Sequence, residues 1–203
     1  MRIKSNCLFA LLALSAGLWT ACEHPTKAPK PPKAPTLPTA ATPPAPAPPA
    51  NVPKDAVKGD FDGDGMTEYV WLVPPEVTED MECPGGCTSH LRFSKATLPA
   101  IEQADCIGGT PTNLGDLDEN GSDEIGLLPQ RFMGCWVGYY VYTYLAPGQW
   151  RPLVQPFSTY CNQWEDDVVP IEKDPSRKGY VLIRYTDSAD TTFTVRTKSV
   201  PVE

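Results

Sequence analysis

Two acidic loops hold the residue types best suited to chemistry in this chain of 203 residues. The stretch "GDFDGDGMTEYVWLV" (residues 59–73) sets oxygen-bearing side chains at alternate positions, and "GDLDENGSDEIGLLP" (115–129) repeats the pattern 56 residues later. Alternate side chains of a tight loop can converge on one calcium ion, which takes about six to eight oxygen ligands. The candidate side-chain ligands are Asp60, Asp62, Asp64 and Glu68 in the first loop and Asp116, Asp118, Asn120 and Glu124 in the second.

Each loop also has the glycine that a sharp turn requires. Gly65 and Gly121 stand at loop position 6, and the residues after them, Met66 and Ser122, would each offer a backbone carbonyl. Oxygen ligands without cysteine or histidine favour calcium over zinc or copper. The pattern therefore predicts two calcium sites, with solvated acidic turns as the alternative.

The residues that follow the loops favour strands over helices. A helical calcium hand needs a bidentate glutamate at loop position 12, where this chain has Trp71 and Leu127. The runs "YVWLV" and "IGLLP" are short, apolar and bounded by glycine or proline, which is typical of buried strands. Each cation would therefore lie at the start of a strand.

A third, degenerate copy of the loop, "EKDPSRKGYVLIRY", begins at Glu172 after a further 56 residues. It keeps acids at positions 1 and 3, but serine, arginine and tyrosine replace the third acid, the glycine and the closing carboxylate. We expect this loop to have lost its metal. Either Arg177 or Lys178 supplies positive charge in its place, or the segment is a surface turn with Pro175 at its corner.

A period of 56 residues with an acidic loop before each apolar strand resembles the FG-GAP repeat of integrin-like β-propellers, whose loops have the form D-x-D-G-D-G-x-x-D. The resemblance covers the two loops and their strands, with glutamate in place of the closing aspartate. It implies one antiparallel blade per repeat, with calcium fixing the loop that leads into a strand. Three repeats are too few to close a ring of about four to eight blades. The resulting expectation is an all-β monomer, a compact open or partial propeller, with a β-sandwich as the alternative.

The segments between the loops alternate as strands do. In "CWVGYYVYTYLAPGQWRPLV" an aromatic face is expected opposite a mixed apolar face, and Pro147 with Gly148 would form a tight turn. Aromatic residues on one face serve cross-strand packing, with stacking on sugars as the alternative. The two faces are Trp136, Tyr140, Tyr142 and Tyr144, and Val137, Tyr139, Val141 and Leu145.

The N-terminus is typical of an exported bacterial lipoprotein. Residues 1–21 combine Arg2 and Lys4 with a short apolar run and small residues, as a signal peptide does, and "GLWTAC" sets Cys22 where a lipid would be attached. Plain secretion with Cys22 left as a thiol is the alternative. Residues 22–53 would then be the lipidated cysteine and a tether, because 12 of the 24 prolines lie here and favour an extended polyproline II chain.

Size and charge describe the remaining residues, 54–203. They are enough for one domain with its own core. Without the signal peptide the chain keeps 15 basic and 25 acidic residues, which argues against nucleic acid as a partner. Acids concentrated in loops indicate metal binding, while solubility is the alternative explanation of the charge.

The predicted repeat domain has five cysteines, and an oxidising compartment would pair them. Alignment of the repeats sets Cys87 against Cys135, and Cys106 against Cys161. Equivalent positions favour equivalent bonds, so the expected disulfides are Cys87–Cys106 and Cys135–Cys161. Cys83 would then be free or would take the place of Cys87.

The sequence indicates a protein without catalytic activity. It contains no nucleophile elbow, zinc-protease helix, phosphate loop or dinucleotide motif. The alternative is a hydrolase that uses the acids at 165–167 as catalytic carboxylates. His90 is expected to be a half-buried strand residue and not a catalytic base. We expect an envelope lipoprotein held at the membrane by its lipid and facing the periplasm or the cell surface. Its domain would either bind a protein or glycan, or use calcium and disulfides for stability alone.

Overall fold

In the part of the chain that the structure describes, the strands form three antiparallel sheets, one for each repeat of the sequence. A computed structural model describes residues 49–203 except 147 and 162–167. The expected signal peptide, Cys22, most of the tether and the acids at 165–167 lie outside the described residues. The described part has twelve strands and no α-helix, and so no apolar helix long enough to cross a membrane. The all-β fold is confirmed.

The first sheet is a meander in which chain order and spatial order agree. Its strands are β1 (Val57–Gly59), β2 (Glu68–Val73), β3 (Thr88–Phe93) and β4 (Ile101–Ala104). Strand β3 alternates as the sequence suggests, and His90 on it is half-buried as expected.

In the second sheet, two short strands share the outer edge of β7. Its inner strands follow the same meander, but β8 pairs with the end of β7 and β9 pairs with its start. The strands are β5 (Pro111–Asn113), β6 (Ile125–Leu127), β7 (Val137–Leu145), β8 (Gln149–Pro152) and β9 (Phe157–Thr159).

The third sheet has three strands, ordered β10, β11, β12. They are β10 (Ile171–Lys173), β11 (Tyr180–Thr186) and β12 (Val195–Pro201). Strand β12 is largely exposed and leaves one edge of the sheet unpaired among the described residues. None of the three sheets closes on itself, which is consistent with an open propeller-like stack and also with a layered sandwich.

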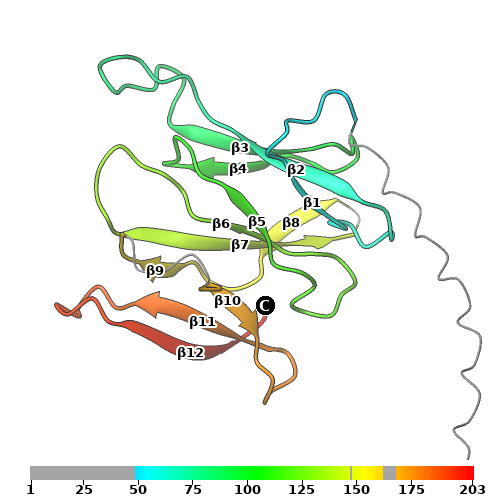
Figure 1. Ribbon diagram of the computed structural model, residues 1–203, viewed down its shortest axis with the longest axis vertical. Helices are drawn as coiled ribbons and strands as arrows, with labels where there is room; N and C mark the ends of the chain where they lie inside the picture. The colour runs from blue at the N-terminus through cyan, green and yellow to red at the C-terminus, as the bar shows by residue number, and fades with distance from the viewer. Residues whose placement is uncertain (1–48, 147, 162–167) are drawn as a thin grey trace, which may run out of the picture. The chain divides into compact units, whose positions relative to one another are not determined.

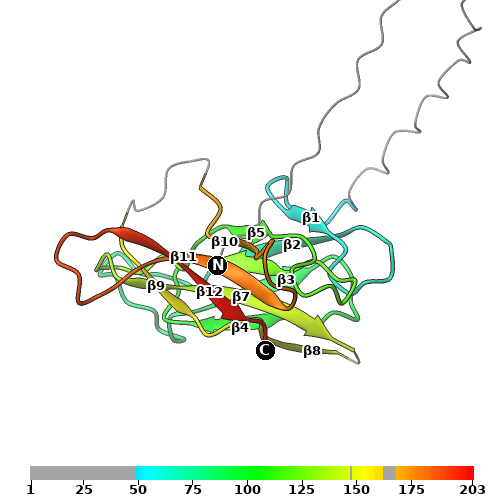
Figure 2. The same cartoon turned by 90° about the horizontal axis from the view of Figure 1, so that it is seen from below.

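The two faces of β7 belong to two different cores, so the second sheet lies between the other two (Figure 1). Tyr139 and Val141 pack with Ile183 of the third sheet. Tyr142 and Tyr144 pack against the core that includes residues of the first sheet. Figure 2, seen from below, looks through β11 and β12 onto the other sheets. This packing confirms the alternation expected for residues 137–145.

The aromatic face of β7 is used for packing. The hydroxyl of Tyr142 donates to Gln103 of the first sheet at 2.5 Å, and Tyr144 meets Trp150 edge to face with ring centroids 5.1 Å apart. Trp150 in turn stacks on Phe93 at 5.0 Å. These contacts join the first and second sheets, as cross-strand aromatic pairs commonly do.

One of the two expected disulfides forms and the other is wrong. Cys135 and Cys161 are bonded, which ties the segment before β7 to the segment after β9. Cys87 is bonded to Cys83 and not to Cys106. The turn of "CPGGC", in which the amide of Gly86 donates to the carbonyl of Cys83, brings the two cysteine Cα atoms to 5.2 Å. Such a short loop closes at little entropic cost, so Cys106 is left as a buried thiol.

Candidate metal centre

The two acidic loops join β1 to β2 and β5 to β6, and they lie at the same end of their sheets (Figure 1). A buried residue at loop position 2 anchors each of them, Phe61 in one core and Leu117 in the other. Gly65 and Gly121 adopt the left-handed conformation, with φ of 81° and 94°. The glycine turn predicted from the sequence is therefore confirmed in both loops.

Three carboxylates meet in each loop. One oxygen from every member of a group lies within 4.8 Å of the others. Two oxygens bound to one calcium ion, each at about 2.3–2.6 Å, can be at most about 5 Å apart. Both groups satisfy this limit, so each could hold a metal ion. The groups are Asp60, Asp62 and Glu68, which we call the first cluster, and Asp116, Asp118 and Glu124, which we call the second cluster.

The two oxygens of the closing glutamate in each loop have different surroundings. One oxygen of Glu68 accepts the backbone N–H of Phe61 at 3.0 Å, and one oxygen of Glu124 accepts the backbone N–H of Leu117. Both glutamates are buried. The repeated glutamate at position 9 therefore fastens the loop onto its strand and leaves a second oxygen for the cluster.

The second oxygen of Glu124 has no hydrogen-bond donor among the described residues. The side chain is fully buried, at 0 % exposure. Burial raises the pKa of Glu124 to about 7, and the charges of Asp118 and Asp116 act in the same direction. The Thr143 hydroxyl is close enough to lower the pKa of Glu124, but its hydrogen bond goes to Asp118, at 3.3 Å. A buried carboxylate oxygen without a donor is costly unless a cation pairs with it.

Backbone amides orient the other side chains of the second loop. Asp116 accepts the N–H groups of Asn120 and Gly121, each at 3.1 Å. Asn120 turns its oxygen to the N–H of Ser122, at 2.7 Å, and its NH₂ group to Asp118, at 3.2 Å. As oriented, Asn120 presents donors to the cluster, so the structure does not bring its oxygen in as the sequence predicted.

The first cluster differs because a lysine lies within it. The ammonium of Lys95 lies 2.5 Å from Asp62, 2.6 Å from Asp64 and 3.7 Å from Glu68. These contacts raise the pKa of Lys95, and the hydrogen bond from Lys95 lowers the pKa of Asp64. Burial, by contrast, raises the pKa of Glu68. Asp64 also accepts the N–H of Met66 at 2.8 Å, which closes the end of the loop.

Sequence reasoning missed Lys95, although a signal for it exists. Lys95 follows β3, which pairs with β2 in the register Val70 to Phe93. That register brings the residues after β3 back beside the loop that precedes β2. The sequence pattern that would have identified it is a lysine just after the strand that pairs with the strand following an acidic loop.

The third loop carries no comparable group of acids among the described residues. Glu172 lies in β10 and pairs with Arg184, and Asp174 accepts the hydroxyls of Ser176 and Ser199, both at 2.6 Å. Of the two candidate cations, Arg177 stacks on Tyr180 and Lys178 pairs with Glu119 of the second loop, at 2.9 Å. Hydrogen bonds from the two serines lower the pKa of Asp174, and the charge of Arg177 acts in the same direction.

The three loops are linked in series. Asp60 and Asp123 exchange contacts, since the N–H of Asp60 donates to the Asp123 carboxylate at 3.0 Å and the N–H of Asp123 donates to the Asp60 carbonyl at 2.7 Å. Glu119 then connects the second loop to Lys173 and Lys178 at the third sheet. An ion in the second loop would therefore brace the contacts among all three sheets.

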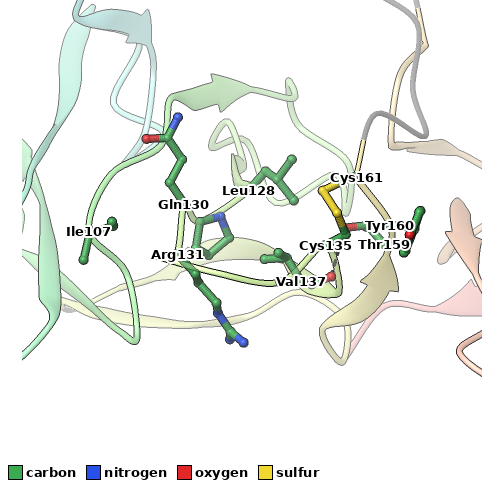
Figure 3. A pocket seen from close by; sticks show the side chains of 11 residues that line it. Ile107, Leu128, Gln130, Arg131, Cys135, Val137, Thr159, Tyr160 and Cys161 are labelled. Carbon is green, nitrogen blue, oxygen red and sulfur yellow. Dashed lines mark hydrogen bonds between the residues drawn. A yellow bond between two sulfur atoms is a disulfide. The ribbon is translucent and has the colours of Figure 1, made fainter. Parts of the chain in front are cut away.

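A separate hollow of about 570 Å³ lies at the start of β7, where Val137 lines it (Figure 3). Thr143, which contacts the second cluster, lies toward the other end of β7. The Cys135–Cys161 bond forms part of the wall of the hollow, and Arg131 is the charged group of its lining. A smaller hollow shares Ile107 and Arg131 with this one. Its lining also includes Cys87, Phe132 and the exposed Met133. The lining of neither hollow contains a pair of carboxylates or a histidine.

Comparison of the chain with models of protein families, with curated proteins and with solved structures gave no match.

Proposed function

We propose that this chain is a bacterial envelope lipoprotein whose β-repeat domain is stabilised by calcium at the second acidic loop. The observation that carries the proposal is Glu124, which is fully buried and holds an oxygen without a donor beside two aspartates. No lysine or arginine among the described residues pairs with these three carboxylates. A divalent cation would pair with the free oxygen of Glu124 and offset the charge of the two aspartates beside it.

Calcium suits the ligands better than magnesium or a transition metal. The candidate ligands are oxygens, which disfavours zinc and copper. Magnesium requires oxygens at about 2.0–2.1 Å in strict octahedral geometry, while calcium accepts a wider, irregular set. The backbone carbonyl of Ser122 remains a predicted further ligand. In this proposal the ion does no chemistry and fixes the loop, as the resemblance to FG-GAP repeats implies.

The anchoring half of the proposal depends on Cys22 and the segment before it. The signal-like residues 1–21, the cysteine and the proline-rich tether support lipid attachment. Two disulfides in the described part of the chain fit an oxidising compartment outside the cytoplasm.

The domain itself is proposed as an interaction module and not an enzyme. An exposed apolar region near the Cys135–Cys161 bond favours this over a purely structural role. Met133 is 83 % exposed, and Phe193, at 44 %, stacks on Tyr160 beside Trp136. Exposed apolar groups around a hollow are a common property of sites that bind proteins or glycans.

The cation half is tested by thermal unfolding of the purified protein in chelator and then in increasing calcium. The expected result is a rise in melting temperature with calcium that Asp118→Asn abolishes. Glu102→Gln, which removes one exposed carboxylate from β4, is the matched control and should keep the rise. A melting temperature that calcium leaves unchanged would overturn the proposal.

The anchor is tested by fractionation of cells that express the wild type or Cys22→Ser, with labelled fatty acid in the medium. The expected result is label and membrane association in the wild type only. Equal membrane association of the two forms without label would refute lipid attachment.

A further inference from the structure

The first and second clusters have different residues at one equivalent position. The sheet registers of the two repeats correspond, since residues 56 apart in β2 and β6 pair with residues of β3 and β7. Lys95 lies two residues after Phe93, the β3 residue that pairs with Val70. Thr143 lies two residues after Val141, the β7 residue that pairs with Gly126. The equivalent pairs are Val70 with Phe93 and Gly126 with Val141.

The two side chains differ in charge. Thr143 is neutral and buried, and its hydroxyl accepts the NH₂ of Asn120 at 3.0 Å and donates to Asp118. Lys95 is cationic, and its ammonium contacts three carboxylates of the first loop, two of them at 2.5 and 2.6 Å. Its side chain is 29 % exposed, so it reaches the cluster from the solvent side.

The ammonium of Lys95 lies among the carboxylates of the first loop as a metal ion would, while Oδ1 of Asp60 and Oδ1 of Asp62 have no hydrogen-bond partner among the described residues. It contacts Asp62 and Glu68, which are two of the three carboxylates that could bind a cation there. A divalent ion in the same space would lie beside a positive charge and would have to displace it. The second cluster has no such competitor among the described residues.

We propose that the Lys95 ammonium replaces the divalent cation at the first loop, so that each chain binds one calcium ion, in the second loop. The inference depends on the proposed function, because it assumes that the second cluster binds calcium. It changes the expectation from the sequence, in which both loops hold calcium. The first loop then keeps its shape without metal, and the second requires metal.

The test counts calcium ions on the purified protein by native mass spectrometry after equilibration with calcium chloride. Wild type is expected to bind one ion. Lys95→Thr, which gives the first loop the residue of the second, is expected to bind two. Lys198→Thr removes an exposed lysine of β12 and is the matched control, with one ion expected.

A second pair of variants keeps the test decisive if Lys95→Thr does not fold. With Lys95 present, Asp62→Asn should leave the count at one, and Asp118→Asn should lower it to zero. A wild type that binds two ions, with each aspartate variant losing one, would overturn the inference and leave the proposed function intact. A count of zero in the wild type and in Lys95→Thr would overturn the proposed function, and the inference with it.

Discussion

Replacement of Glu124 by glutamine should stabilise the ion-free protein while it abolishes calcium binding. The carboxyl is fully buried, and its pKa is raised from 4.5 to about 7, chiefly by burial. Each pH unit of displacement corresponds to about 1.4 kcal/mol, so the ionised form costs the folded state about 3 kcal/mol at pH 8. Glutamine carries no charge and keeps an oxygen that can accept the N–H of Leu117.

The sign of the pH dependence follows from the direction of this shift. Below pH 4.5 the carboxyl is protonated in both states, and it contributes nothing to the difference. Between pH 4.5 and 7 the folded state holds a proton that the unfolded state has lost, so the free energy of unfolding falls as the pH rises. Above pH 7 the carboxylate is ionised in both states, and its burial lowers the free energy of unfolding by the full amount. Other groups titrate in both proteins, so their effects cancel in the comparison of Glu124→Gln with wild type.

The assay is denaturant unfolding in chelator at pH 4.5, 6 and 8, repeated at pH 8 with calcium. In chelator, the free energy of unfolding of Glu124→Gln should exceed that of wild type by about 2–3 kcal/mol at pH 8 and should equal it at pH 4.5. When the calcium concentration is a hundred times the dissociation constant, the free energy of unfolding of wild type should rise by about 2.7 kcal/mol and that of the variant should not change. A variant that is less stable than wild type at pH 8 in chelator, or that keeps the calcium gain, would refute the reasoning.

Three further perturbations test the fold that supports the site. Leu127→Ala removes a fully buried side chain of β6 and should lower the free energy of unfolding by about 2–5 kcal/mol in denaturant titrations. Gly126→Ala sets a methyl group 2.0 Å from the Tyr139 hydroxyl and should cost about 1–3 kcal/mol, whereas Gly85→Ala, in open space, should change stability by less than about 0.5 kcal/mol. The double variant Cys135→Ser, Cys161→Ser should lose about 3 kcal/mol, and Cys83→Ser, Cys87→Ser less, because its loop is short. Equal losses from the two cysteine pairs would contradict the loop-length argument.

The features that local sequence determines could be predicted well. The alternation of β7 depends on the two-residue period of a strand, and Gly65 and Gly121 depend on the left-handed turn that their loops require. Each of these is fixed by residues close together in the chain. The acidic clusters followed from the same local spacing, since Asp60 and Asp62 are separated by one residue.

The features that depend on distant segments were missed. Lys95 reaches the first loop through the pairing of β2 with β3, so the residues of the loop alone do not reveal it. The repeat alignment favoured a bond from Cys87 to Cys106, but the tight turn at Gly86 offered a nearer partner. Glu172 was aligned with a loop position, yet the third loop is shorter than the first and begins later, so this residue lies in β10.

A crystal structure of the protein grown in calcium, with anomalous scattering measured to locate the ion, would decide whether the second loop is a calcium site. The result we predict is one ion bonded to Asp116, Asp118 and Glu124 at about 2.3–2.6 Å, with Lys95 still between Asp62 and Asp64. Anomalous density absent from the second loop, with Glu124 oriented as in the ion-free protein, would contradict it.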